Sequence, residues 1–166
     1  MNQTLSSSRD PVCGMQVDIA GAEHSATYRD VVFHFCSSQC RERFDDNPAL
    51  YALQRIADIR PMPKRHALRL AAGTAADVAR ACQRVGEMMG ISAVRAEQER
   101  LIVDYDLRQV ALSQIEAVAA AEGLRFKDGL HGFRRGLWKF TEANELANAA
   151  HPGTGACCSR PPAGKG

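Results

Sequence analysis

Three cysteines near the start of the chain have a spacing that suits metal chemistry. Cys13 lies in the segment DPVCGM, and Cys36 and Cys40 lie in FHFCSSQC, so that twenty-two and then three residues separate successive thiols. Thiolates are soft ligands that suit Cu(I) or Zn(II) better than Mg or Ca. Zinc prefers a fourth ligand, for which His34, His24 or solvent are candidates, whereas three-coordinate Cu(I) needs none. We therefore predict that the three thiols meet at one metal ion.

Alternative roles for these residues stay open. Free cysteines often serve as small buried hydrophobes, but three of them beside a Cys-Gly-Met turn favour a metal site. The thioether of Met15 is an additional candidate ligand for Cu(I), and core packing is an equal alternative for it. His34 lies in an alternating apolar segment, where a single histidine more often has a structural role.

A hairpin and a helix must position the thiols. The segment ATYRDVVFHF predicts two short strands around a turn at Arg29 and Asp30. Ser37 is predicted to be the N-cap of a helix over SSQCRERF, which puts Cys36 just before the helix and Cys40 in its first turn. We expect the N-terminus of that helix to favour the thiolate form of both.

The small size of this unit is a second argument for a metal. A unit of about forty-five residues buries too little surface to be comfortably stable alone. A structural metal would supply the deficit, since zinc-finger peptides gain roughly 10–16 kcal/mol from zinc binding.

Changes in composition divide the chain into six parts and predict an α+β fold. Pro61 and Pro63 mark a linker, because each proline disfavours helix at the residue before it. The predicted parts are a disordered leader (1–9), the Cys-bearing hairpin and helix unit (10–54), the linker (55–65), a second domain (66–126), a loop with an amphipathic helix (127–150), and a flexible Cys-containing tail (151–166).

The second domain follows a strand–helix–strand–strand–helix–strand order. HALRLAA, ISAVRA and LIVDYDL alternate as strands do, and LRF is a short last strand. Thr74 can cap the first helix, which we expect to end at Gly90, and the second helix is predicted from about Arg108 to Glu122. This order predicts an antiparallel sheet covered on one face by two helices. Cys82, Met88 and Met89 are predicted to belong to the core or the helix end rather than to a metal site.

The first unit resembles the YHS domain, a relative of the Cys-rich TRASH metal-binding modules. The resemblance implies a heavy-metal-binding module, found alone or attached to copper-transporting ATPases, metal sensors and some oxygenases. The matching residues are Asp10 to Met15, Val17, Tyr28, Phe33 to Ser37, Cys40, Phe44, Asn47, Pro48 and Tyr51.

The second domain resembles the heavy-metal-associated (HMA) domain, the ferredoxin-like βαββαβ fold of small copper chaperones. That family binds metal through Cys-x-x-Cys after the first strand, but the corresponding loop here, AAGTAADVAR, has no cysteine. The resemblance therefore implies the fold without its binding site. It leaves the domain able to dock a similar domain of a partner or to form a homodimer.

The tail carries the adjacent thiols Cys157 and Cys158, with His151 nearby. Vicinal thiols chelate one small ion poorly, but they can capture or hand over Cu(I) by exchange. An exposed thiol pair is an oxidation hazard, which weakens the alternative of incidental cysteines. Both interpretations of the tail stay open.

Composition excludes several other classes. The start of the chain lacks the pattern of a signal peptide, and no apolar run is long enough to span a bilayer, so we expect a cytoplasmic protein. Six cysteines in that reducing compartment argue for metal or redox chemistry rather than disulfides. With a net charge of +2 and no basic residues interleaved with aromatics, no nucleic-acid partner is expected.

The sequence thus predicts a protein that binds and traffics Cu(I) by thiolate exchange, with a copper-transporting ATPase or another metal-binding domain as partner. The alternative is a zinc-stabilised interaction or sensor module. No Cys-x-x-Cys pair and no Cys-His-carboxylate arrangement are evident, so we expect no enzymatic activity.

Overall fold

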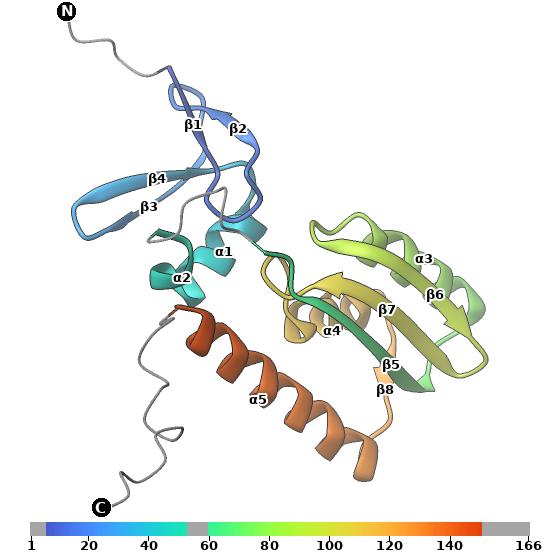
Figure 1. Ribbon diagram of the computed structural model, residues 1–166. Coiled ribbons are helices and arrows are strands. Elements are labelled where there is room, and N and C mark those ends of the chain that lie inside the picture. The colour runs from blue at the N-terminus through green and yellow to red at the C-terminus, as the bar shows by residue number, and fades with distance from the viewer. Residues whose placement is uncertain (1–5, 53–59, 151–166) are drawn as a thin grey trace, which may run out of the picture.

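Two small hairpins and two helices form the N-terminal unit (Figure 1). The computed structural model describes residues 6–52 and 60–150. In the first of these ranges both hairpins are antiparallel, and the helices follow them in the chain. The elements are β1 Ser7–Arg9, β2 Gln16–Asp18, β3 His24–Tyr28, β4 Val31–Phe35, α1 Ser38–Asp46 and α2 Pro48–Ala52.

The turn of the β3–β4 hairpin is the predicted one. Arg29 and Asp30 have φ of 50° and 64°, and Tyr28 pairs with Val31 across them. Two consecutive residues with positive φ are typical of the two-residue turn whose twist matches that of the paired strands. The turn therefore sets the register that brings the end of β4 back beside the start of β3.

The prediction of a disordered leader is wrong for residues 7–9. They form β1, in which Ser8 pairs with Val17 of β2, and the side chain of Gln16 donates a 2.9 Å hydrogen bond to the hydroxyl of Ser7. The backbone groups of this polar stretch are satisfied by a neighbouring strand, which composition alone does not reveal.

Phe44 of α1 lies at the centre of the N-terminal unit. Its side chain is 1% exposed, and its ring is within 6.4 Å, centroid to centroid, of four other aromatic rings. Those rings come from β3, β4 and α2, so Phe44 joins the elements of the unit into one core. The four are Tyr28, Phe33, Phe35 and Tyr51.

A four-stranded antiparallel sheet and two helices form the second domain. The strands lie in the order β6-β7-β5-β8, and the chain follows the predicted strand and helix sequence. The first strand begins at Pro63, inside the stretch predicted as linker. The elements are β5 Pro63–Ala72, α3 Ala75–Gly86, β6 Ile91–Glu97, β7 Arg100–Asp106, α4 Leu112–Ala121 and β8 Arg125–Phe126.

The helix limits depart from the prediction at two places. Thr74 caps α3 as expected, in a reciprocal arrangement with Asp77, but α3 ends at Gly86 rather than at Gly90. The second helix, α4, begins four residues later than Arg108. The carboxylate of Asp106 accepts a hydrogen bond from the Arg108 amide at 3.0 Å and holds this stretch in a turn.

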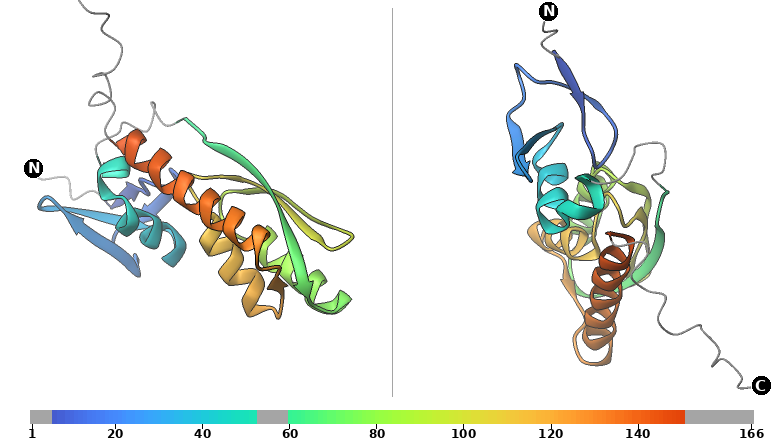
Figure 2. Two further views of the ribbon diagram at one scale, coloured as in Figure 1. Left: turned by 90° about the horizontal axis from the view of Figure 1, so that it is seen from below. Right: turned by 60° about the vertical axis from the view of Figure 1, so that its left-hand side comes forward.

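Helices cover one face of the sheet, and they include a third, α5 Leu130–Ala150. The inward side chains of the central strands are fully buried, as Leu68, Leu101 and Val103 show. Figure 2 shows α5 running beside α4 toward α2. Trp138 of α5 stacks on His66 of β5 with centroids 4.3 Å apart, so the helix rests on the second domain.

The two domains, which the prediction divides by a linker, pack against each other in the structure. Leu107 of the second domain and Leu146 of α5 belong to the core of the N-terminal unit. Arg43 of α1 donates a 2.5 Å hydrogen bond to the Leu107 carbonyl, and the Tyr51 hydroxyl donates one of 2.6 Å to the Arg108 carbonyl. Satisfied buried backbone carbonyls at this contact give the domains a defined relative position.

Within the two described ranges, the helices fall short of the length and apolar character needed to cross a bilayer.

Candidate metal centre

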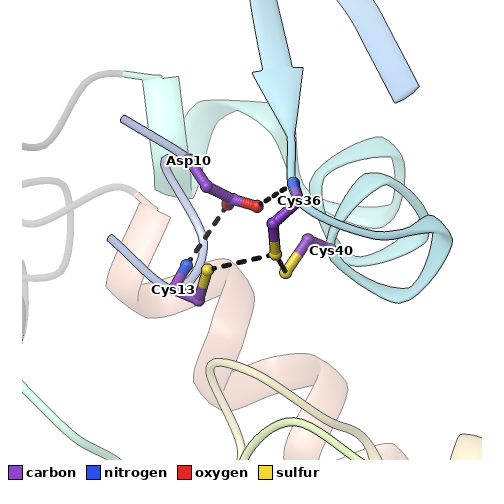
Figure 3. Close-up of side chains that lie close together, drawn as sticks. All are labelled: Asp10, Cys13, Cys36 and Cys40. Atoms are coloured by element: carbon purple, nitrogen blue, oxygen red, sulfur yellow. Dashed lines mark hydrogen bonds between the residues drawn. The ribbon is translucent and has the colours of Figure 1, made fainter. Parts of the chain in front are cut away.

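Three thiols lie together at the base of the hairpins (Figure 3). The Sγ atom of Cys36 is 3.5 Å from that of Cys13 and 3.7 Å from that of Cys40, and all three cysteines are free. Two sulfurs bound at about 2.3 Å to one tetrahedral ion are about 3.8 Å apart. The two sulfur pairs that include Cys36 are therefore within a few tenths of an ångström of a chelating arrangement, and all three sulfurs lie within 4.8 Å of one another.

Each thiol is placed by a different local structure. Cys36 follows β4, and Cys40 lies in the first turn of α1, where the predicted N-cap Ser37 accepts a 3.3 Å hydrogen bond from the Cys40 amide. Cys13 lies in a tight turn in which the Gly14 amide donates a 2.8 Å hydrogen bond to the Asp10 carbonyl. Gly14 has φ of 79°, which favours glycine there.

Asp10 also belongs to the site, although the sequence analysis did not predict a functional role for it. Its carboxylate is fully buried. One oxygen accepts hydrogen bonds from the amides of Val12 at 2.8 Å and Cys13 at 3.3 Å, and the other accepts one from the Cys36 amide at 2.9 Å. Asp10 thus joins the two thiol-bearing loops, and one of its oxygens lies within 4.8 Å of the three sulfurs. Its only signal in the sequence is its place in the DPVCGM motif.

The three thiols differ in acidity. The pKa of Cys13 is lowered to about 7, chiefly by hydrogen bonding from Cys40. Burial, followed by the Asp10 carboxylate, raises the pKa of Cys36 to about 11. The pKa of Cys40 is also raised, first by its hydrogen bond to Cys13 and then by burial. Cys13 is thus the thiol that ionises first, and a metal ion must displace the protons of the other two.

The expectation that the helix N-terminus favours thiolate at Cys36 and Cys40 is therefore wrong for the metal-free cluster. Burial and the Asp10 carboxylate raise the pKa of Cys36, and the hydrogen bond to Cys13 followed by burial raises the pKa of Cys40.

Met89 brings a fourth sulfur to the cluster. The prediction placed Met89 in the core or at the helix end and did not foresee this contact. Its Sδ atom accepts a hydrogen bond from the Cys40 thiol at 3.3 Å. The residue comes from the second domain, forty-nine positions along the chain. Consecutive methionines before Gly90 were its only signal, and Met88 packs instead against the core of the second domain.

The other predicted candidates are not part of the cluster of Asp10 and the three cysteines, or they lie outside the described residues. Met15 is 55% exposed, and the group formed by Asp10 and the three cysteines does not include His34. His24 and Cys36 both line an open cavity of about 240 Å³. Cys82 packs against the core of the second domain, as predicted. His151, Cys157 and Cys158 lie in the undescribed range 151–166.

Comparisons with known proteins agree with the geometry of this site. The family model of the YHS domain matches residues 8–55. A copper-transporting P-type ATPase from Rhizobium leguminosarum bv. viciae is 42% identical over 43 residues, which are 26% of this chain and 5% of that protein. A search of solved structures gave no significant match. The family match identifies the N-terminal unit as a YHS domain, and the chain covers only a small part of the length of the copper-transporting relative.

Proposed function

We propose that the protein binds Cu(I) through the thiolates of Cys13, Cys36 and Cys40 and passes it on by thiolate exchange. The observation that carries this proposal is the meeting of three free thiols at 3.5 and 3.7 Å within the YHS domain. Sulfur ligands select soft ions, of which Cu(I) is one. In this proposal the protein works in a reducing compartment, the cytoplasm, and is a carrier rather than an enzyme.

The burial of the thiols supports transfer. Cys40 is fully buried, whereas Cys13 and Cys36 are partly exposed. An incoming thiolate can therefore reach the ion from the side of Cys13 and Cys36 and replace them one at a time, with Cys40 released last. Cys13, which has the lowest pKa of the three, is the best leaving thiolate.

The recipient in this proposal is a copper-transporting ATPase or another metal-binding domain. The similarity to part of such an ATPase supports this partner. We also propose that the second domain is ferredoxin-like, which its antiparallel order β6-β7-β5-β8 and its two crossover helices support. Such a domain offers a docking surface for the recipient.

Anaerobic titration of the full chain with Cu(I) against a coloured chelator tests the proposal. We expect one tightly held ion, and we expect Cys36→Ser to weaken it by at least about 100-fold, because each ligand supplies roughly 3 kcal/mol of a total near 10–16 kcal/mol. Cys82→Ser, a thiol in the other core, is the matched control and leaves affinity unchanged. Weak Cu(I) binding whose affinity is the same in the wild type and in Cys36→Ser would contradict the proposal.

A zinc-stabilised module is the second candidate, and Asp10 is the observation that favours it. A carboxylate beside three thiols completes the four ligands that zinc prefers. Stoichiometric zinc that Cu(I) does not displace from the purified protein would favour this function over Cu(I) transfer.

A further inference from the structure

The loop between α3 and β6 carries Met89 to the thiol cluster. Met89 lies two residues beyond the C-cap of α3, and its side chain packs in the core of the N-terminal unit. Its Sδ atom is 3.3 Å from the Sγ atom of Cys40. This distance is shorter than the distances from the Cys36 sulfur to the sulfurs of Cys13 and Cys40, which are 3.5 and 3.7 Å. The second domain thus contributes a sulfur to the group of thiols on the first.

The backbone of Met89 is held by a side chain of the thiol-bearing helix. Gln39, the residue before Cys40, accepts a hydrogen bond from the Met89 amide at 3.1 Å and donates one to the Met89 carbonyl at 2.7 Å. The same amide nitrogen of Gln39 also donates to the Gln109 carbonyl at 3.2 Å. Because Gln39 and Cys40 are neighbours in α1, any shift of the cysteine carries the methionine loop with it.

The loop is also fixed from its own domain. Gly90 has φ of 87°, and a Cβ atom there would lie 2.6 Å from Cβ of Gln109. The Asp106 amide donates a 2.8 Å hydrogen bond to the Gly90 carbonyl. The position of Met89 is therefore set on both sides, as a metal ligand requires.

We propose that Met89 is the fourth sulfur ligand of Cu(I), so that one ion is held by both domains. This inference rests on the proposed function. In the metal-free protein the Cys40 Sγ atom lies 3.3 Å from the Met89 Sδ atom. When Cu(I) binds, the Cys40 thiol releases its proton to solvent, and a lone pair of the thioether is free to face the ion.

A thioether is a neutral, soft ligand, and this determines which metal it selects. It adds no negative charge to a site that already has three thiolates and the Asp10 carboxylate nearby. A neutral thioether is a weaker base than a thiolate, imidazole or carboxylate, which are the usual ligands of borderline-soft zinc, and it suits the softer Cu(I) better. Met89 therefore favours Cu(I) over zinc at a cluster that is otherwise suited to both.

The ligand also couples metal loading to domain contact. The ion would join α1 to the α3–β6 loop, in addition to the hydrogen bonds of Gln39. Removal of Cu(I) by a recipient then removes one link between the domains and leaves the Gln39 hydrogen bonds and the Cys40–Met89 contact, so the domain contact is strongest in the loaded state.

Cu K-edge X-ray absorption of the full chain labelled with selenomethionine tests the inference directly. We expect a selenium scatterer at bonding distance from copper in addition to sulfur. It should persist in Met15→Leu and Met88→Leu and disappear in Met89→Leu. A copper centre with sulfur scatterers only, in labelled protein that is otherwise fully loaded, would overturn the role of Met89 and leave the proposed function intact.

Chelator competition supplies a second measurement. We expect Met89→Leu to lower Cu(I) affinity by about tenfold or more, with zinc affinity unchanged, and Met88→Leu to change neither. Equal Cu(I) affinity in Met89→Leu and the wild type would also overturn the inference. Failure of the wild type to bind Cu(I) at all is a different result, and it would overturn the proposed function itself.

Discussion

The Asp10 carboxylate accepts a 2.9 Å hydrogen bond from the backbone amide of Cys36, twenty-six residues away. Its other oxygen accepts from the amide of Cys13. A single buried side chain therefore holds the two loops whose thiols meet (Figure 3). This arrangement makes Asp10 a positioning residue for the two thiol-bearing loops, and it leads to the first prediction.

Asp10→Asn should weaken both the fold and metal binding. The amide keeps one acceptor oxygen but turns a donor group toward one of the backbone amides that Asp10 now accepts from, and buried unsatisfied donors are costly. We expect the free energy of unfolding to fall by about 1–3 kcal/mol. Metal affinity should fall by about 10–100-fold, as for other residues that orient ligands. Denaturant unfolding and chelator competition measure the two effects.

Asp18→Asn is the matched control. Asp18 is exposed, and its carboxylate accepts one hydrogen bond, from the Ala20 amide at 3.2 Å. We expect a change within about 0.5 kcal/mol. Equal effects of the two substitutions would show that burial of Asp10 has no special consequence.

Phe44→Ala should remove most of the stability of the N-terminal unit. The ring is 1% exposed and contacts aromatic side chains of β3, β4 and α2. Truncation of a buried phenylalanine costs about 3–5 kcal/mol. A metal ion that binds only the folded protein, at about 1,000 times its dissociation constant, raises the free energy of unfolding by about 4 kcal/mol. We therefore expect metal addition to move the unfolding midpoint of the variant back toward that of the metal-free wild type.

Phe133→Ala is the control for this prediction. Phe133 lies on α5 and is 70% exposed, so its removal should change the free energy of unfolding by less than about 0.5 kcal/mol. A Phe44→Ala variant whose stability does not respond to metal would contradict the link between this core and the thiol cluster.

Glu142→Gln should change how stability depends on pH. Glu142 of α5 is 4% exposed, accepts a hydrogen bond from the Tyr105 hydroxyl and another from the Leu112 amide at 3.0 Å, and burial raises its pKa. When the pKa of a group is higher in the folded than in the unfolded protein, the group stabilises the fold at pH values below its unfolded-state pKa, which is about 4.3 for glutamate. That contribution is lost as the pH rises through the folded-state pKa. The variant should therefore gain stability relative to the wild type as pH rises from 4 to 8.

Chemical denaturation across that pH range measures the difference. Glu145→Gln is the control, because Glu145 is more exposed, with 37% of its side chain accessible, and pairs with Lys64. If the free energy of unfolding of the wild type and of Glu142→Gln changed with pH in the same way, the raised pKa of Glu142 would be contradicted.

Local patterns in the sequence determined the elements that carry the thiols. The turn at Arg29 and Asp30, the Ser37 cap and the placement of Cys40 in the first helical turn were all predicted and are present. Each depends on residues within a few positions of one another, where backbone preferences and short hydrogen bonds decide the conformation. The same patterns predicted the strand and helix order of the second domain.

Only the tertiary structure decided what surrounds the thiols. Met89 meets Cys40 because two domains pack together, and that packing depends on contacts such as Arg43 with the Leu107 carbonyl, sixty-four residues apart. The order of thiol acidity likewise follows from the hydrogen bonds among the thiols, from burial and from the Asp10 carboxylate. The sequence by itself determined which sulfurs are available and which local elements carry them. Their partners and protonation depend on long-range packing, which leaves no periodic signal in the chain.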